Sequence, residues 1–182
     1  MNVSRITCHV SRLGLFLAVI TAVLTAQAAD PAQPKRELGR YTSKAWRWSI
    51  AYPAGWTVEA KDPDLVRIRS AADNALCSIH SGPMDRFNSV DELTDFLLAN
   101  DAQFFREKSQ KFTVLARKRI SLPNRIEGND VLAEIGPGGR SRRVHVLADG
   151  RGFAIDCEGY AKSWSKLEPA YQRVIASFTV RK

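Results

Sequence analysis

Residues 46–56 read Trp-Arg-Trp-Ser-Ile-Ala-Tyr-Pro-Ala-Gly-Trp, and this stretch indicates the fold class of the chain. Trp48, Ile50 and Tyr52 alternate with small or polar residues, which predicts a half-buried strand over residues 46–52. The Pro-Ala-Gly that follows is typical of a turn, and Trp56 begins a second strand. These two strands open the folded unit, and the order of the elements that follow predicts the fold class.

Strand patterns continue on both sides of an amphipathic helix. Ser89 and Glu92 form the two ends of a capping box, and apolar residues then recur at helical spacing, which predicts a helix over residues 90–108. A second helix is predicted over residues 165–177, before a short strand at 178–180. The remaining predicted strands cover residues 65–69, 76–81, 112–122, 130–135, 143–148 and 153–159. This order of elements predicts an α+β fold, an antiparallel β-sheet with helices packed against it.

The first 28 residues have the three parts of a secretory signal peptide. Arg5 and Arg12 precede an apolar run over residues 13–26, and Ala26-Gln27-Ala28 is a small-x-small cleavage site. A retained membrane anchor is the alternative, but the run is shorter than the roughly 20 residues of a spanning helix. Cys8 precedes the run, where no lipid-attachment cysteine would lie. We therefore expect a periplasmic or secreted protein, cleaved near Ala28.

Composition and chain length indicate one folded domain after this segment. The 182 residues are 45% hydrophobic and 25% charged, which excludes a disordered tail, a fibrous protein and a polytopic membrane protein. Residues 29–44 are polar and show no apolar period, so we expect them to be a linker. Residues 45–182 are predicted to form the single α+β domain.

Cys77 and Cys157 are the two cysteines that remain after cleavage, and an even count in an exported chain indicates a disulfide. Cys77 shares a strand face with Ile79, and Cys157 shares one with Ile155. Both sulfurs are therefore expected to point into the core and to join. The alternative is a pair of buried free thiols.

The opening Trp48-Ser49-Ile50-Ala51-Tyr52-Pro53-Ala54-Gly55-Trp56 resembles the aromatic-x-x-x-Tyr-Pro-x-Gly-Trp opening of PsbP-like and Mog-like domains. The closing stretch is similar too, with Trp164, Tyr171 and the run Ile175-Ala176-Ser177-Phe178-Thr179-Val180. Residues 89–97 resemble the Ser-x-x-Glu-Phe/Leu helix of that family. The resemblance covers nearly all of residues 45–182 and implies that Tyr52 and Trp56 bury against the last helix.

The resemblance implies a non-enzymatic accessory or binding role. Members of the family in plants and cyanobacteria assist photosystem II on the lumenal side, and others are bacterial envelope proteins. A eukaryotic branch binds a small GTPase. The family supplies no catalytic residues that could be carried over to this chain, and a shared fold does not by itself imply a function.

Basic residues are concentrated between positions 111 and 143, a stretch that contains eight Lys and Arg residues but only three Asp and Glu residues. This charge has two interpretations. The first is a solvated sheet face that keeps the protein in solution. The second is a patch for an anionic partner, such as a membrane head group, an acidic polysaccharide or an acidic protein. The candidate anion-binding residues are Arg117, Lys118, Arg119, Arg140, Arg142 and Arg143.

Signals for catalysis or metal binding are weak. Ser163-Trp164-Ser165-Lys166 matches the Ser-x-x-Lys nucleophile signature, but the other motifs of that enzyme class are missing, so we interpret it as a helix start. His80 and His145 could join Asp85, Asp156 or Glu158 on the outer sheet face, but solvated residues explain that pattern equally well. We therefore predict no catalytic residues, no metal and no cofactor.

Together these patterns predict a non-catalytic accessory or binding protein of the bacterial cell envelope, which engages an anionic partner through the basic residues. We expect a monomer that binds a protein or an anionic envelope component, no nucleic acid, and a membrane at most peripherally. The alternatives are a small periplasmic hydrolase with an unrecognised site and a membrane-associated structural protein. If the structure clusters neither the basic residues nor the two histidines with their acidic neighbours, we expect a protein partner to bind a surface of exposed aromatic residues.

Overall fold

A computed structural model describes residues 38–181 of the chain, and these residues belong to one compact unit. The predicted signal peptide, residues 1–28, lies outside the described residues. The strands are β1 (Gly39–Ser43), β2 (Trp48–Tyr52), β3 (Thr57–Asp62), β4 (Leu65–Ser70), β5 (Ala75–Pro83), β6 (Phe112–Leu122), β7 (Ile126–Ile135), β8 (Gly139–Ala148), β9 (Arg151–Tyr160) and β10 (Thr179–Val180). The helices are α1 (Val90–Glu107) and α2 (Trp164–Ala176), with short 3-10 turns at Pro123–Arg125 and Ala161–Ser163.

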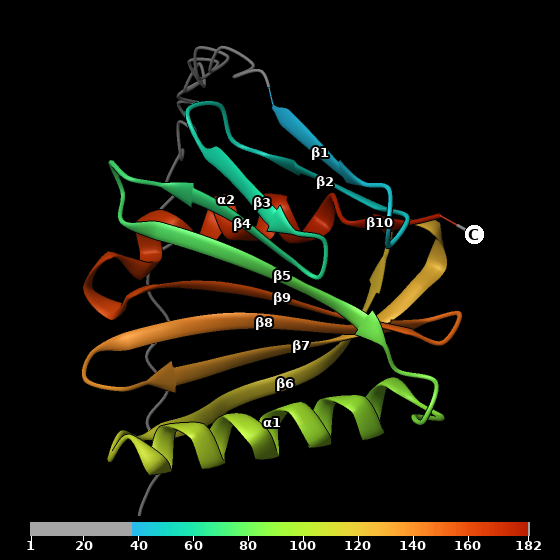
Figure 1. The fold of residues 1–182 in the computed structure, drawn as a ribbon. Coiled ribbons are helices and arrows are strands. Elements are labelled where there is room, and N and C mark those ends of the chain that lie inside the picture. Colours follow the sequence, from blue (N-terminus) through green and yellow to red (C-terminus); the bar gives the residue numbers. More distant parts are fainter. Residues whose placement is uncertain (1–37, 182) are drawn as a thin grey trace, which may run out of the picture. The chain divides into compact units, whose positions relative to one another are not determined.

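Seven of the described strands form one antiparallel sheet, in the order β3-β4-β5-β9-β8-β7-β6. α1 packs against β6, β7 and β8 and runs beside β6 at one end of the sheet (Figure 1), whereas α2 packs against β2, β8 and β9. The predicted α+β class, an antiparallel sheet with packed helices, is confirmed. Neither described helix combines the length and the apolar composition that crossing a bilayer requires.

The second described sheet has three strands in the order β1-β2-β10. β1 falls within residues 29–44, where we expected a linker, so regular structure begins before Ala45. Its Tyr41 ring lies 5.4 Å from the Trp48 ring, and this aromatic contact stabilises the pairing of β1 with β2. β2 also differs from the expected half-buried strand, because Ser49 and Ala51 on its second face are buried as well. Ser177 receives a hydrogen bond from the backbone N–H of Ala51 and closes that face.

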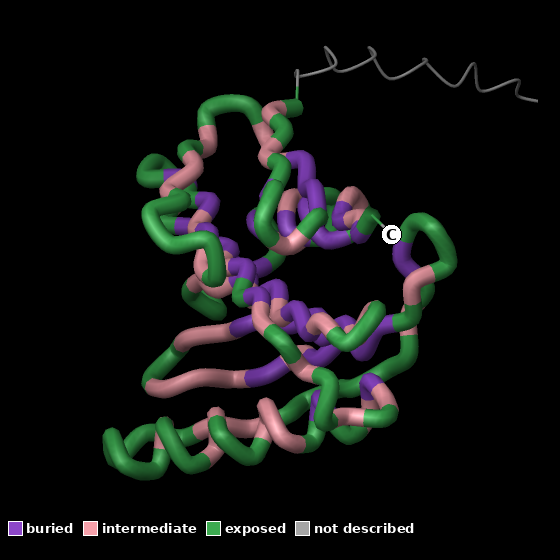
Figure 2. The backbone as a smooth tube through the Cα atoms, turned by 45° about the vertical axis from the view of Figure 1, so that its right-hand side comes forward, coloured by how far each residue is buried: buried purple, intermediate pink, exposed green. Residues whose placement is uncertain are grey.

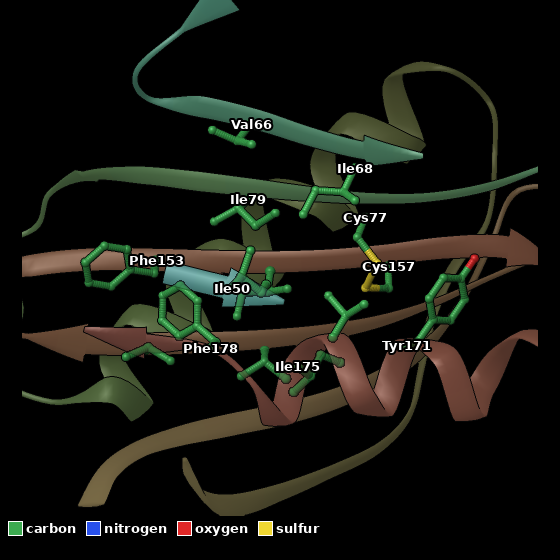
Figure 3. Packing of buried hydrophobic residues seen from close by; sticks show 14 of the residues in the cluster. Ile50, Val66, Ile68, Cys77, Ile79, Phe153, Cys157, Tyr171, Ile175 and Phe178 are labelled. Atoms are coloured by element: carbon green, nitrogen blue, oxygen red, sulfur yellow. A yellow bond between two sulfur atoms is a disulfide. The ribbon is translucent and has the colours of Figure 1, made fainter. Parts of the chain in front are cut away.

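The hydrophobic core lies between one face of the seven-stranded sheet, the small sheet and α2 (Figures 2 and 3). Trp48 of β2 is fully buried and donates its indole N–H to Ser81 Oγ over 2.9 Å. Phe178, just before β10, packs between Trp48 and Phe153. Trp56 meets Tyr171 of α2 edge to face at 6.1 Å, which agrees with the expectation that this tryptophan packs on the last helix.

Cys77 and Cys157 form a disulfide, as predicted, and both side chains are fully buried. The two residues stand directly opposite each other on β5 and β9, with their Cα atoms 4.0 Å apart. Figure 3 shows the bond in the core, among residues of both sheets and α2. The disulfide therefore joins two central strands whose cysteines lie 80 positions apart in sequence.

Two local signals that were read from the sequence form as expected. Ser89 caps α1 by accepting the Glu92 backbone N–H over 3.2 Å. Glu92 accepts from the Asn88 backbone N–H, one residue earlier than in a standard capping box. Asp149 and Gly150, with φ of 51° and 70°, make the tight turn between β8 and β9.

Candidate functional site

The seven-stranded sheet has a second face, and α1 covers only part of it. α1 packs on β6, β7 and β8, so the outer side chains of β4, β5 and β9 lie beyond the helix. The register of the three strands brings these side chains together. Arg67 of β4 lies opposite Ser78 of β5, and on β9 Asp156 lies opposite Ser78 and Glu158 opposite Leu76. We call this surface the open face. Its residues are Arg67, Arg69, Leu76, Ser78, His80, Ala154, Asp156, Glu158 and Tyr160.

A buried arginine marks the boundary between the open face and α1. Arg143 is 5% exposed, and its guanidinium forms an ion pair and hydrogen bond with Asp101 of α1. On the open-face side its Nε lies 3.3 Å from Asp156 Oδ1, and its Nη2 lies 3.6 Å from Glu158 Oε1. Ser141 Oγ accepts a hydrogen bond from the same Nε over 3.1 Å. One desolvated cation therefore has carboxylates on two sides.

Asp156 is the least satisfied of these carboxylates. Its Oδ1 is buried and makes no hydrogen bond, since the nearby Arg143 Nε is directed at Ser141. Burial raises the pKa of Asp156 to about 7; Arg143 opposes this rise, and the charges of Asp101 and Glu158 add to it. Near neutral pH this carboxyl is therefore divided between its protonated and ionised forms.

Both predicted histidines lie on this side of the sheet. His80 is exposed on the open face opposite Ala154, and His145 is buried under α1. Neighbouring groups still shield part of the His80 imidazole from water, and this partial desolvation, with the charges of Arg67 and Arg143, lowers the pKa of His80. Burial, with Arg143 and Arg117, lowers the pKa of His145 to about 3, so that imidazole is neutral at physiological pH. The sequence had suggested that His80, Asp156 and Glu158 share a face, and they do.

The described residues do not assemble a recognisable catalytic or metal site. His145 Nδ1 has no hydrogen-bond partner, and among the described side chains His80 makes no hydrogen bond to a carboxylate or hydroxyl. No group of three His, Cys, Asp or Glu within residues 38–181 is arranged to hold a metal ion. Ser163 is the N-cap residue of α2, but its Oγ donates to the Tyr160 carbonyl and does not cap the helix, and Lys166 pairs with Asp73.

The six candidate anion-binding residues are divided between the two faces of the sheet. Arg117 and Arg119 pair with Asp91 of α1, and Arg143 reaches Asp101 of the same helix. The other three lie on the side of α2. There Lys118 and Arg142 share Asp130, at 3.7 and 2.6 Å, and the Arg140 guanidinium lies 6.0 Å from the Trp164 ring.

All six also have a carboxylate partner within the described chain. Arg140 pairs with Glu134 at 3.7 Å, and Arg142 makes a bidentate contact with Asp130. The six residues therefore do not share one surface, because neighbours along a strand point to opposite faces. Anion binding by these residues stays a prediction, and it would have to compete with the existing pairs.

Two hollows indent the open face near the turn that joins β4 and β5. One, of about 460 Å³, is lined by Arg67 and Arg69 together with Asn74 and Leu76. The other, of about 230 Å³, shares Asn74 and Leu76 and extends to Tyr160, which is 51% exposed. Arg67 has no ion-pair partner among the described residues. The open face therefore has concave relief, an exposed aromatic ring and an uncompensated cation.

Some residues of this region were not singled out in the sequence. Asp101 follows Leu93 and Leu97 at four-residue steps, a spacing that places it on the buried side of α1. Arg67 and Arg69 alternate with Val66 and Ile68, which signals a charged outer face. What no local pattern supplies is the order of strands, which brings β4, β5 and β9 together.

Solved structures of low sequence identity share this fold. The cyanobacterial PsbP protein (CyanoP) of Synechocystis sp. PCC 6803 matches with a TM-score of 0.65 at 12% identity, over 85% of this chain and 99% of that one. A Pseudomonas aeruginosa protein of unknown function matches with a TM-score of 0.53 at 14% identity, over 80% and 99% of the two chains. No protein-family model matches the sequence, and no curated protein is similar enough to count as a relative. The likeness concerns the fold alone, and the chain therefore has a PsbP-like α+β fold.

Proposed function

We propose that this chain is an exported, non-catalytic accessory protein of the bacterial cell envelope, and that an anionic partner docks on the open face. The observation that carries the proposal is the exposed half of the sheet beside α1. It combines Arg67, which lacks an ion-pair partner among the described residues, with two hollows and the exposed ring of Tyr160. Arginine and tyrosine are enriched among residues that dominate binding energy in protein interfaces.

The charge of the surface favours an anionic partner. Arg67 and Arg69 line the larger hollow, and only Arg69 has a carboxylate neighbour, Glu59. Glu158 lines the smaller hollow, and both Glu158 and Asp156 form ion pairs with Arg143. An acidic side chain of a partner that docks over β4 would contact two guanidinium groups. That of Arg67 has no ion-pair partner among the described residues, and that of Arg69 is paired with Glu59. We therefore place the anionic contact at β4, in preference to the six basic residues of β6 and β8.

Export is supported by the signal-peptide pattern of residues 1–28 and by the buried Cys77–Cys157 disulfide. Disulfides persist mainly in oxidising compartments, such as the bacterial periplasm. A chain expressed with its own first residues should be recovered in the periplasmic fraction and should begin at Ala29, which intact mass measurement would reveal. Recovery of the full-length chain in the cytoplasm would contradict this part of the proposal.

The partner is tested by capture from an envelope extract with purified protein, followed by elution over a salt gradient. Arg67→Glu should abolish capture, because it places a like charge where the anionic group docks. Arg140→Glu is the matched control on the opposite face, and it should leave capture unchanged. Loss of capture with Arg140→Glu alone would return the anionic contact to the predicted basic residues and would refute the open-face assignment.

A further inference from the structure

A separate pocket of about 660 Å³ lies where three connections meet, away from the open face. It is formed by the β6–β7 connection, the β8–β9 turn and the end of β10, which converge near the C-terminal end of the described chain (Figure 1). Its volume falls within the range of about 300–1,000 Å³ that is typical of small-molecule sites. The open face, by contrast, belongs to β4, β5 and β9.

The pocket has an apolar floor that continues into the core. Val180 is 5% exposed and belongs to the core cluster, and Ile126 and Ala148 pack against that cluster from its edge. These three residues lie at the ends of paired strands. An apolar portion of a ligand could therefore displace water from this floor with a favourable free energy.

The charged lining is positive. The guanidinium groups of Arg125 and Arg181 have no ion pair and no hydrogen bond among the described residues, in contrast to the arginines of β6 and β8. The acid of the pocket, Asp149, is already paired with Arg151 at 3.1 Å. Two cations therefore face the pocket without compensation, which favours an anionic group of the ligand.

The backbone around Arg125 is held in an uncommon conformation. Asn124 and Arg125 have φ of 63° and 58°, in the left-handed region, at the turn between β6 and β7. Asparagine adopts this region more readily than most residues, but arginine does so at a cost that glycine would avoid. Local strain of this kind is frequent at ligand sites, where the side chain is needed for binding.

We propose that this pocket binds an anionic amphiphile, with a carboxylate or phosphate head group held by Arg125 and Arg181 and an apolar chain on the floor of Ile126, Ala148 and Val180. The proposal is independent of the partner on the open face, since the two surfaces share no residue. It also gives Arg125 and Arg181 a function that the arginines of β6 and β8, which are engaged with carboxylates, do not have.

Calorimetric titration of the purified protein with octanoate and with octyl phosphate tests the proposal and distinguishes the two head groups. At least one of them should bind with a stoichiometry of one, whereas acetate, inorganic phosphate and octanol should not bind measurably at the same concentrations. Arg125→Ala and Arg181→Ala should each weaken binding by about tenfold, the effect of losing one charge-assisted hydrogen bond. Arg106→Ala, in the last turn of α1, removes the same charge elsewhere and should leave binding unchanged.

Arg125→Gly separates binding from folding. It relieves the left-handed backbone, so the variant should unfold at an equal or higher denaturant concentration while binding is weakened as in Arg125→Ala. The proposal is wrong if neither amphiphile binds the unaltered protein, or if Arg125→Ala and Arg181→Ala bind as tightly as it does. An equal loss with Arg106→Ala would show a general charge effect and would also overturn it.

Discussion

Arg143 and Asp156 face each other across β8 and β9, with Arg143 Nε 3.3 Å from Asp156 Oδ1, yet no hydrogen bond joins these two atoms. The same guanidinium is engaged by Asp101 of α1 and by Ser141. Burial raises the pKa of Asp156 to about 7, and Arg143 offsets this rise only in part because Asp101 and Glu158 share its charge. This relationship leads to the first three predictions.

Asp156→Asn should stabilise the protein above pH 7. The folded-state pKa of Asp156 is raised to about 7, above its unfolded value, so the native state binds the extra proton and its stability decreases as pH rises from about 4 to 7. Asparagine does not ionise, so the variant avoids this decrease in stability. At pH 8 its unfolding free energy should exceed that of the unaltered protein by on the order of 2–4 kcal/mol. Urea unfolding at pH 5 and pH 8 measures both values. Asp85→Asn, at an exposed site, is the control and should change neither.

His145→Leu should act in the opposite pH direction. Burial lowers the folded-state pKa of His145 to about 3, so stability is present above the unfolded value near 6.5 and is lost as pH falls below it. The leucine variant should keep its stability between pH 6 and pH 4. Its unfolding free energy should rise as the pH falls in this range, because the protonation of Asp156 is then no longer masked by that of His145. If the stability profile of His145→Leu matches that of the unaltered protein in this range, the neutral buried imidazole is not the acid-sensitive group.

Arg143→Met should be strongly destabilising. It leaves Asp101 and the largely buried Asp156 without their cation, and breaking the ion pairs of a buried arginine in this way typically costs about 3–5 kcal/mol. Arg69→Met removes an ion pair with Glu59 at a half-exposed position and should cost less than about 1 kcal/mol. Denaturant midpoints of the two variants at pH 7 provide the comparison. Equal effects would mean that burial does not set the strength of the Arg143 contacts.

Loss of the Cys77–Cys157 disulfide should reduce stability substantially. The bond closes a loop with a sequence separation of 80, for which the chain-entropy relation gives about 4–5 kcal/mol. The double variant Cys77→Ala, Cys157→Ala and the protein reduced under denaturing conditions should show the same decrease in unfolding free energy. Unchanged unfolding after complete reduction, verified by thiol titration, would contradict the expectation.

Several structural features were predicted from short stretches of sequence, because local chemistry determines them. The alternation around Trp48 and Ile50 predicted β2, the cap at Ser89 predicted the start of α1, and Asp149-Gly150 predicted a hairpin. The disulfide could also be predicted, because the alternation of side chains along each strand directs both cysteines toward the core. β1 was missed because its residues have no apolar period of their own and pair through the backbone with β2.

The candidate surfaces could not be predicted to the same extent. Arg117 and Lys118 are adjacent in the chain but lie on opposite faces of the sheet, and their partners Asp91 and Asp130 come from other elements. The clustering of positive charge in the sequence therefore did not produce a single patch. Arg67, Arg125 and Arg181 lack an ion-pair partner among the described residues, and they become notable only where they line hollows.

By itself, the sequence determined the periodicities, the turns and caps, and the facing of the cysteines, because each depends on residues a few positions apart. Only the tertiary structure decided which charges are compensated. The strand order places Asp156 beside Arg143 and leaves β4, β5 and β9 beyond the reach of α1. The physical reason is that ion pairing and desolvation act through space between groups that the chain brings together only on folding.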